Sequence, residues 1–207
     1  MKDSRNYLAE KVEELRLELQ KRDTAVLAAN TRTIFKPTNP GQGYFELTVW
    51  GETAVLTWPD FVGRDAETGD PMPVMMQAML AYYFHTADGT PPAGEWMAFG
   101  QLPDGQFYTA AFQGYTGNEL VKVFGNDVDE FRETAVALGG QFAPMGDAAF
   151  TFSVFPGVSL MVVCWQGDED FSPSYRLLFD ANASHQLPTD ACAILGSTLT
   201  RRLVKLA

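Results

Sequence analysis

The chain has few of the residues on which most catalytic centres depend. It contains only two cysteines, Cys164 and Cys192, and only two histidines, His85 and His185, among 207 residues. Neither cysteine belongs to a paired spacing, so we expect both to be reduced core residues. With two histidines, a histidine-based triad or a three-histidine zinc site would need many carboxylates to complete it.

The sequence also lacks the short motifs that identify common enzymes. It has no glycine-rich phosphate loop ending in Lys-Ser or Lys-Thr, no Gly-x-Ser-x-Gly and no His-Glu-x-x-His. No apolar run reaches the roughly 18 residues of a membrane span, and the N-terminus opens with charge instead of an apolar signal segment. We therefore expect a cytoplasmic protein with no membrane partner.

Positive charge is scarce. Fifteen Lys and Arg stand against 26 Asp and Glu, which gives a formal net charge of −11. Such a field repels phosphate backbones, so the sequence predicts no nucleic-acid partner. It suits cations or a basic protein face, although an acidic coat for solubility is the simpler interpretation. The cofactor, and whether the partner is a small molecule or a protein, stay open.

The apolar content is enough for a folded core. Hydrophobic residues make up 46% of the chain and aromatic residues 13%. No flexible linker divides the sequence, so we expect a single domain over residues 1–207, with an N-terminal helix over 1–31 and an α+β core over 44–207.

The first thirty residues carry an amphipathic pattern. Apolar residues recur at spacings of three, four or seven, which predicts one helix from Ser4 to about Asn30. This helix either docks on the domain or pairs with a second copy in a homodimer, and docking is favoured because the pattern is short for a coiled coil. The predicted stripe consists of Leu8, Val12, Leu15, Leu19 and Val26.

Strand patterns fall in two groups separated by helical patterns. This order predicts the α+β class, with a central antiparallel, possibly mixed, sheet of about five strands and flanking helices. We expect a β-hairpin over 44–58 and strands at 149–155, 158–166 and 175–179. We expect helices at 72–83, 108–113, 118–124, 128–138 and from Pro188 onward.

One candidate binding surface follows from methionines at helical spacing. Met75 and Met79, with Met72 and Met76, could cover a flat cofactor ring or an apolar partner. Tyr83 and His85 end the same pattern, and His85 could ligate a tetrapyrrole metal. Core packing is the alternative, since methionines are ordinary core fillers.

The densest acidic cluster is Asp168-Glu169-Asp170, directly after a predicted strand. Carboxylates at a strand end could hold Mg²⁺ or Ca²⁺, or act as general acid and base. A charged turn that ends a buried strand is the alternative. Asp180 begins a stretch that resembles a calcium loop, but the glycine and the glutamate of that motif are replaced by His185 and Ala191.

A series of short motifs over residues 45–207 resembles the domain of unknown function family 3786, found mainly in anaerobic bacteria and archaea. The family has no established activity. The resemblance implies a link to anaerobic metabolism, because some relatives look fused to an iron–sulfur module of the corrinoid-protein type, whereas this chain has no cysteine set for a cluster. The motifs are Gly94-Glu95-Trp96, Phe99, Leu102-Pro103, Leu138-Gly139-Gly140, Gly146-Asp147, Trp165-Gln166-Gly167-Asp168-Glu169-Asp170-Phe171 and Leu178-Phe179-Asp180.

Three functions remain open at this point. The leading hypothesis is a non-catalytic binding or accessory domain of anaerobic metabolism, whose pocket involves Met75, Met79 and Tyr83 with Trp96 or Trp165. The first alternative is a metal-assisted hydrolase or lyase that uses the Asp168-Glu169-Asp170 loop. The second is a structural homo-oligomer formed through the N-terminal helix.

Overall fold

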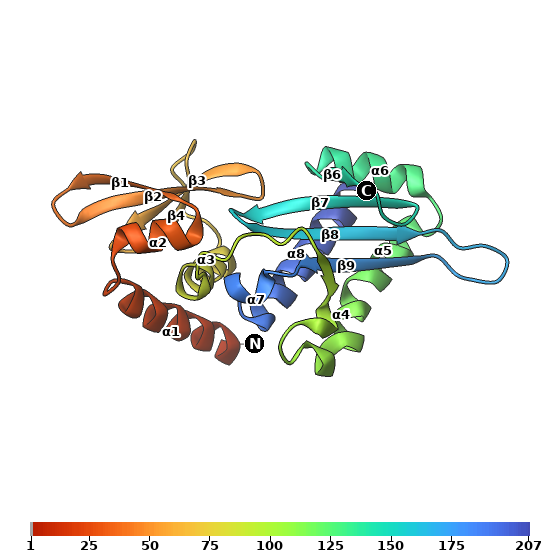
Figure 1. Ribbon diagram of the computed structural model, residues 1–207, viewed down its shortest axis with the longest axis horizontal. Coiled ribbons are helices and arrows are strands. Elements are labelled where there is room, and N and C mark those ends of the chain that lie inside the picture. Colours follow the sequence, from red (N-terminus) through yellow and green to blue (C-terminus); the bar gives the residue numbers. More distant parts are fainter. Residues whose placement is uncertain (1) are drawn as a thin grey trace. The chain divides into compact units, whose positions relative to one another are not determined.

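The computed structural model describes residues 2–207, with side chains from residue 10 onward, and its fold is α+β with antiparallel sheets (Figure 1). The chain forms two compact units. Unit 1 comprises the residues up to Pro91 together with 155–157 and 185–188, and unit 2 comprises 92–154, 158–184 and 189–207. The expectation of a single domain stays a prediction.

Unit 1 contains a four-stranded sheet in the order β1-β2-β3-β4. The predicted hairpin is confirmed as β2 and β3, joined by a turn in which Trp50 and Gly51 adopt positive φ angles of 54° and 86°. β1 contains Pro37, which an edge strand tolerates because its outer side needs no hydrogen-bond donor. The strands are β1 Ile34–Asn39, β2 Gln42–Val49, β3 Glu52–Trp58 and β4 Gly63–Asp65.

Three helices complete unit 1: α1 Lys2–Leu19, α2 Thr24–Thr31 and α3 Val74–Thr86. The prediction of one continuous N-terminal helix was wrong, because the Asp23 carboxylate accepts hydrogen bonds from Ala25 N (2.7 Å) and Val26 N (3.2 Å) and so starts a second helix. Val26 was expected in the apolar stripe, but it is 53% exposed.

The described part of the apolar stripe of α1 is buried within unit 1. Val12, Leu15 and Leu19 are at most 6% exposed, and α1 packs along α3. This face of α1 is therefore docked on α3, which was the favoured expectation. The side chain of Leu8 lies outside the described residues.

An aromatic cluster joins α3 to the sheet of unit 1. The ring of Phe84, on α3, lies 4.9 Å from Phe45 and 5.8 Å from Phe61. One turn earlier along α3, Met79 and Leu80 are fully buried, so this helix supplies much of the core of the unit.

Unit 2 contains a five-stranded sheet in the order β5-β9-β8-β7-β6. The three long strands agree with the predicted ones to within one residue, and their residues are buried at both parities, as the apolar runs indicated. The strands are β5 Trp96–Ala98, β6 Gln141–Ala143, β7 Ala148–Phe155, β8 Val158–Trp165 and β9 Ser174–Asp180.

One face of this sheet is covered by helices. α5 packs against β9, and α8 packs against α4, α5 and α6 (Figure 1). Phe112 lies 5.8 Å from Phe179, and Phe131 lies 5.3 Å from Tyr175. The helical elements are η1 Phe99–Gln101, η2 Gly105–Tyr108, α4 Thr109–Tyr115, α5 Gly117–Phe124, α6 Val128–Ala137, α7 Ala183–Gln186 and α8 Thr189–Leu206.

The other face carries a smaller apolar cluster. Met161, Val163 and Leu178 form its centre with two alanines, and Trp96 and Trp165 pack against it. Among the residues that the structure describes, none of the helices is both long and apolar enough to cross a membrane.

Candidate functional site

The residues of the predicted methionine surface differ in accessibility. Met75 is 43% exposed, whereas Met79 and Tyr83 are at most 1% exposed. The Tyr83 hydroxyl lies 2.5 Å from Thr31 O and 2.6 Å from Pro156 O, and its ring stacks on Phe155 at 5.0 Å. Burial raises the pKa of this hydroxyl. In this conformation Met79 and Tyr83 contribute to packing, whereas Met75 is exposed and Met72 and Met76 are partly exposed.

His85, the proposed tetrapyrrole ligand, is held by an acidic neighbour. Its Nε2 lies 2.8 Å from Glu18 Oε2, and this hydrogen bond, followed by the charge of the imidazole, lowers the pKa of Glu18. The contact joins the end of α3 to α1. Nε2 is therefore already engaged in this conformation, and the ligand role stays a prediction.

Trp96 and Trp165 pack on the same apolar cluster but at opposite ends of β9. Trp96 is paired with Asp180 at one end of this strand, and Trp165 with Ser174 at the other. A six-residue separation along a strand corresponds to about 20 Å. These two indoles therefore do not line one small pocket.

The Asp168 loop forms a closed turn. Asp168 Oδ1 accepts hydrogen bonds from Asp170 N (2.9 Å) and Phe171 N (2.8 Å), and these donors lower the pKa of Asp168. Glu169 and Asp170 are exposed, and the loop extends away from the sheet between β8 and β9 (Figure 1). The Asp168 carboxylate thus shapes the turn itself.

Asp180 lies at the far end of β9 from this loop and is 4% exposed. Its Oδ1 accepts hydrogen bonds from Ala93 N (2.8 Å) and Asn182 N (2.9 Å), and its Oδ2 accepts one from Gly94 N (2.8 Å). Through these three bonds the carboxylate fixes the segment that leads into β5 and the turn that follows β9. Over the described chain, no group of three or more His, Cys, Asp or Glu side chains is arranged to hold a metal ion.

A cleft that the sequence did not indicate lies at the edge of β9 in unit 2. Its volume is about 440 Å³, within the range of ligand sites. Phe99 and Phe112 stack at 4.2 Å along it. Its lining is mostly apolar and consists of Ala98, Phe99, Gln106, Thr109, Ala110, Phe112, Gln113, Arg176 and Leu177.

Close backbone packing positions the walls of this cleft. Gly105 lies so close to Phe99 that a Cβ atom would sit 2.1 Å from Phe99 O, and a Cβ atom on Gly117 would sit 2.1 Å from Tyr175 O. The Gln113 side chain donates a hydrogen bond to the same Tyr175 O (3.0 Å). The turn before α4 and the start of α5 are therefore held tightly beside β9.

Arg176 is the only cationic residue in the lining. It is exposed, and its side chain has no hydrogen bond or ion pair with any of the residues that the structure describes. In a chain with 26 acidic residues, an arginine without an acidic partner at an apolar cleft is available to an anionic ligand.

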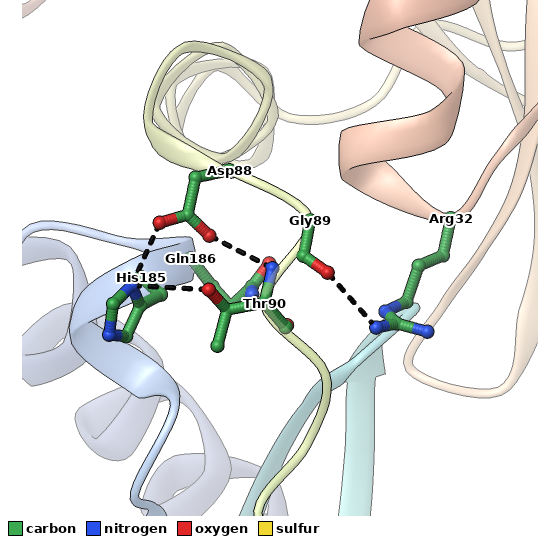
Figure 2. A network of polar contacts seen from close by, with 6 residues as sticks. All are labelled: Arg32, Asp88, Gly89, Thr90, His185 and Gln186. Carbon is green, nitrogen blue, oxygen red and sulfur yellow. Dashed lines mark hydrogen bonds and ion pairs between the residues drawn. The ribbon is translucent and has the colours of Figure 1, made fainter.

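A second polar constellation lies in unit 1. His185 Nδ1 is 2.8 Å from Asp88 Oδ2 and 3.3 Å from Thr90 Oγ1, while the Gln186 amide donates to Thr90 O at 2.9 Å. The hydrogen bond from His185 is the main cause of the lowered pKa of Asp88. Figure 2 shows the second ring nitrogen of His185 directed away from Asp88 and Thr90.

This Asp–His pair orients an imidazole, as catalytic pairs do. Thr90 contacts the same nitrogen as Asp88, however, so its hydroxyl is not placed for activation by Nε2. Figure 2 also shows Arg32 Nη2 donating to Gly89 O (3.2 Å), which ties the end of α2 to this segment. The network therefore joins three stretches of unit 1, and this geometry indicates a structural role.

Sequence patterns contain little that could have identified the cleft. Arg176 follows strand alternation as an outward-facing residue, and Gln113 ends a helical pattern. The one usable signal is the cluster of aromatic residues around Phe99, Phe107, Tyr108 and Phe112, of which Phe107 is 75% and Tyr108 64% exposed.

The chain was compared with protein families, curated proteins and solved structures. No curated protein and no solved structure matches it. The family model described as Domain of unknown function (DUF3786) matches residues 23–202, which is most of the chain, so this protein belongs to that family of unknown function.

Proposed function

We propose that this protein is a non-catalytic binding protein, and that the cleft of unit 2 binds a ligand with an apolar body and an anionic group. The observation that carries the proposal is the unpaired Arg176 at the rim of an apolar cleft. Apolar walls with few convergent polar groups are typical of ligand sites. The proposal keeps the binding role that the sequence suggested and moves it to a different surface.

Different lining residues would contact the apolar body and the anionic group of the ligand. Phe99, Phe112 and Leu177 form the floor of the cleft but are each only 3% exposed. The accessible apolar area comes mainly from Ala98 and Ala110 at the rim, which favours a small ring or branched alkyl group. The guanidinium of Arg176 presents paired donors that match a carboxylate. Gln106 and Gln113 add amide groups that can bind further polar atoms.

A matched pair of probes tests this proposal. Binding of 3-phenylpropionate and of its neutral analogue 3-phenylpropanol is measured by calorimetry on the wild type, Arg176→Gln and the control Lys205→Gln. Lys205 is an exposed cation at the end of α8, outside the cleft lining, so the control removes the same charge elsewhere in unit 2.

The expected effect of Arg176→Gln differs between the two probes. A charge-assisted hydrogen bond contributes about 1.5–3 kcal/mol, so Arg176→Gln lowers the affinity for 3-phenylpropionate by roughly 10- to 100-fold. The same substitution leaves the affinity for the alcohol unchanged, and Lys205→Gln changes neither. Equal carboxylate affinity for the wild type and Arg176→Gln would contradict the proposal, and so would a failure of both probes to bind.

A further inference from the structure

One side of the helical segment formed by η2 and α4 is apolar and open to solvent. Phe107 is 75% exposed, Tyr108 64% and Tyr115 41%. Residues 106–111 are all exposed, and Phe112 is the first residue of α4 that turns into the core. A run of exposed aromatic rings along one helical segment marks a surface that contacts a partner.

The apolar residues on this side are arranged symmetrically. Phe107, Ala111 and Tyr115 are spaced by four residues, which brings them one above another on one side of a helix. The small residue lies midway between the two aromatic residues. This aromatic stripe, Phe107-Ala111-Tyr115, therefore has the same order in both directions along the helix.

The aromatic stripe also lies in a stretch without charge. Residues 105–118 contain no Asp, Glu, Lys or Arg, in a chain whose formal net charge is −11. Two copies of so acidic a chain repel each other through their exposed carboxylates. They approach at the lowest electrostatic cost where neither surface is charged. The described apolar stripe of α1 does not compete for this role, because it is already buried within unit 1.

We infer that the aromatic stripe is the interface of a symmetric homodimer, in which α4 packs antiparallel against α4 of a second copy. A two-fold axis through Ala111 brings the same surface of both copies together, as a closed dimer requires. Phe107 of each copy then lies beside Tyr115 of the other, where the rings pack against each other. The alanines at the axis let the two helices approach closely.

The exposed area indicates a weak, reversible dimer. An aromatic side chain buries about 150–250 Å², so the exposed fractions of Phe107, Tyr108 and Tyr115 amount to roughly 350 Å² per copy. Two copies thus cover about 700 Å² with these rings, whereas stable interfaces bury at least about 1,200 Å². The dimer should therefore form at micromolar to millimolar protein concentration and dissociate on dilution.

Sedimentation equilibrium of the full chain over this concentration range measures the dimer directly. Phe107→Ser should weaken dimerisation at least tenfold. It should leave the fold intact because the side chain is mostly exposed, and circular dichroism checks this. Phe171→Ser is the matched control and should dimerise like the wild type, since Phe171 is 73% exposed but lies in the loop between β8 and β9. Added salt should strengthen wild-type dimerisation, because it screens the repulsion between two acidic copies.

A charge exchange at Ala111 tests the two-fold axis itself. Ala111→Glu and Ala111→Lys each set a charge against the same charge of a second copy, so each variant alone should dimerise at least tenfold more weakly than the wild type. An equimolar mixture of the two variants should associate at least tenfold more tightly than either alone, because residue 111 then faces the opposite charge. Only contact of this residue with its own counterpart produces that recovery.

Three results would overturn the inference: a wild type that stays monomeric at millimolar concentration, a dimer that Phe107→Ser does not weaken, and a mixture of the two Ala111 variants that associates no more tightly than each alone. If the wild type is monomeric but binds phosphatidylcholine vesicles, and Phe107→Ser releases it, the aromatic stripe contacts lipid and the homodimer is wrong. The proposed function is tested separately, because no residue of the aromatic stripe lines the cleft.

Discussion

Asp180 offers the sharpest test of how the fold is held, because one nearly buried carboxylate fixes three backbone donors. The chain segment at Ala93 and Gly94 and the turn at Asn182 all donate to it at 2.8–2.9 Å. Replacing Asp180 with Ala removes both acceptor oxygens and so all three hydrogen bonds at once. The expected result is a large loss of unfolding free energy together with a loosened segment before β5.

The magnitude follows from the surroundings of each donor. The Asn182 N–H belongs to a buried residue, so leaving it without an acceptor costs about 1–3 kcal/mol. Ala93 and Gly94 are exposed, so water can replace the lost acceptor and each bond contributes about 1 kcal/mol. Asp180→Ala is therefore expected to cost about 4 kcal/mol.

The isosteric variant refines the argument. Asp180→Asn keeps the oxygen that accepts from Ala93 and Asn182 but turns an amide donor toward Gly94 N–H, so we expect a loss of about 2 kcal/mol. Asp170→Asn is the control, because it removes the same charge from an exposed side chain and should stay within about 0.5 kcal/mol of the wild type.

Urea unfolding monitored by circular dichroism gives these free energies, and hydrogen exchange reports on the amides of residues 93 and 94. If Asp180→Ala were no more destabilising than Asp170→Asn, or if those two amides exchanged at wild-type rates, the carboxylate would not be the anchor described above.

Two further predictions concern unit 1. Tyr83→Phe should lower the unfolding free energy by about 1–2 kcal/mol, because it removes the hydroxyl shared between Thr31 O and Pro156 O, and unchanged stability in urea would refute this. Asp88→Asn should lower the melting temperature at neutral pH. Since its pairing with His185 depresses the pKa of Asp88 below the ordinary 3.8, the stabilisation is present above about pH 4 and is lost as pH falls further. A difference between variant and wild type that persisted undiminished in acid would argue against this pairing.

The sequence predicts the long elements of this fold because their patterns are local. Alternation identified β2 and β3, and continuous apolar runs identified β7, β8 and β9, whose residues are buried on both faces. Helical spacing identified α3. These patterns depend only on which residues face the core, so one sequence is enough to recognise them.

The missed elements depend on contacts between distant residues. β4 and β6 are only three residues long, so no periodicity can develop, and each exists because a longer strand provides its hydrogen bonds. The helix break at Asp23 could have been recognised, since aspartate is a preferred N-cap residue, but the apolar pattern on both sides concealed it.

The candidate site was harder to predict for the same reason. Acidic side chains attracted attention at Asp168 and Asp180, yet both carboxylates accept backbone N–H groups and shape turns. Arg176 gave no signal, because an arginine on a strand is ordinary unless it lacks a partner. Whether it has one depends on which side chains the fold brings beside it.

The most direct test of the binding proposal is a titration of ¹⁵N-labelled protein with 3-phenylpropionate, followed by two-dimensional NMR. The account predicts that the largest shifts occur at Phe99, Phe112, Gln113, Arg176 and Leu177, and that Arg176→Gln abolishes them at the same ligand concentration. Shifts centred on other residues, or an unchanged spectrum at millimolar ligand, would contradict it.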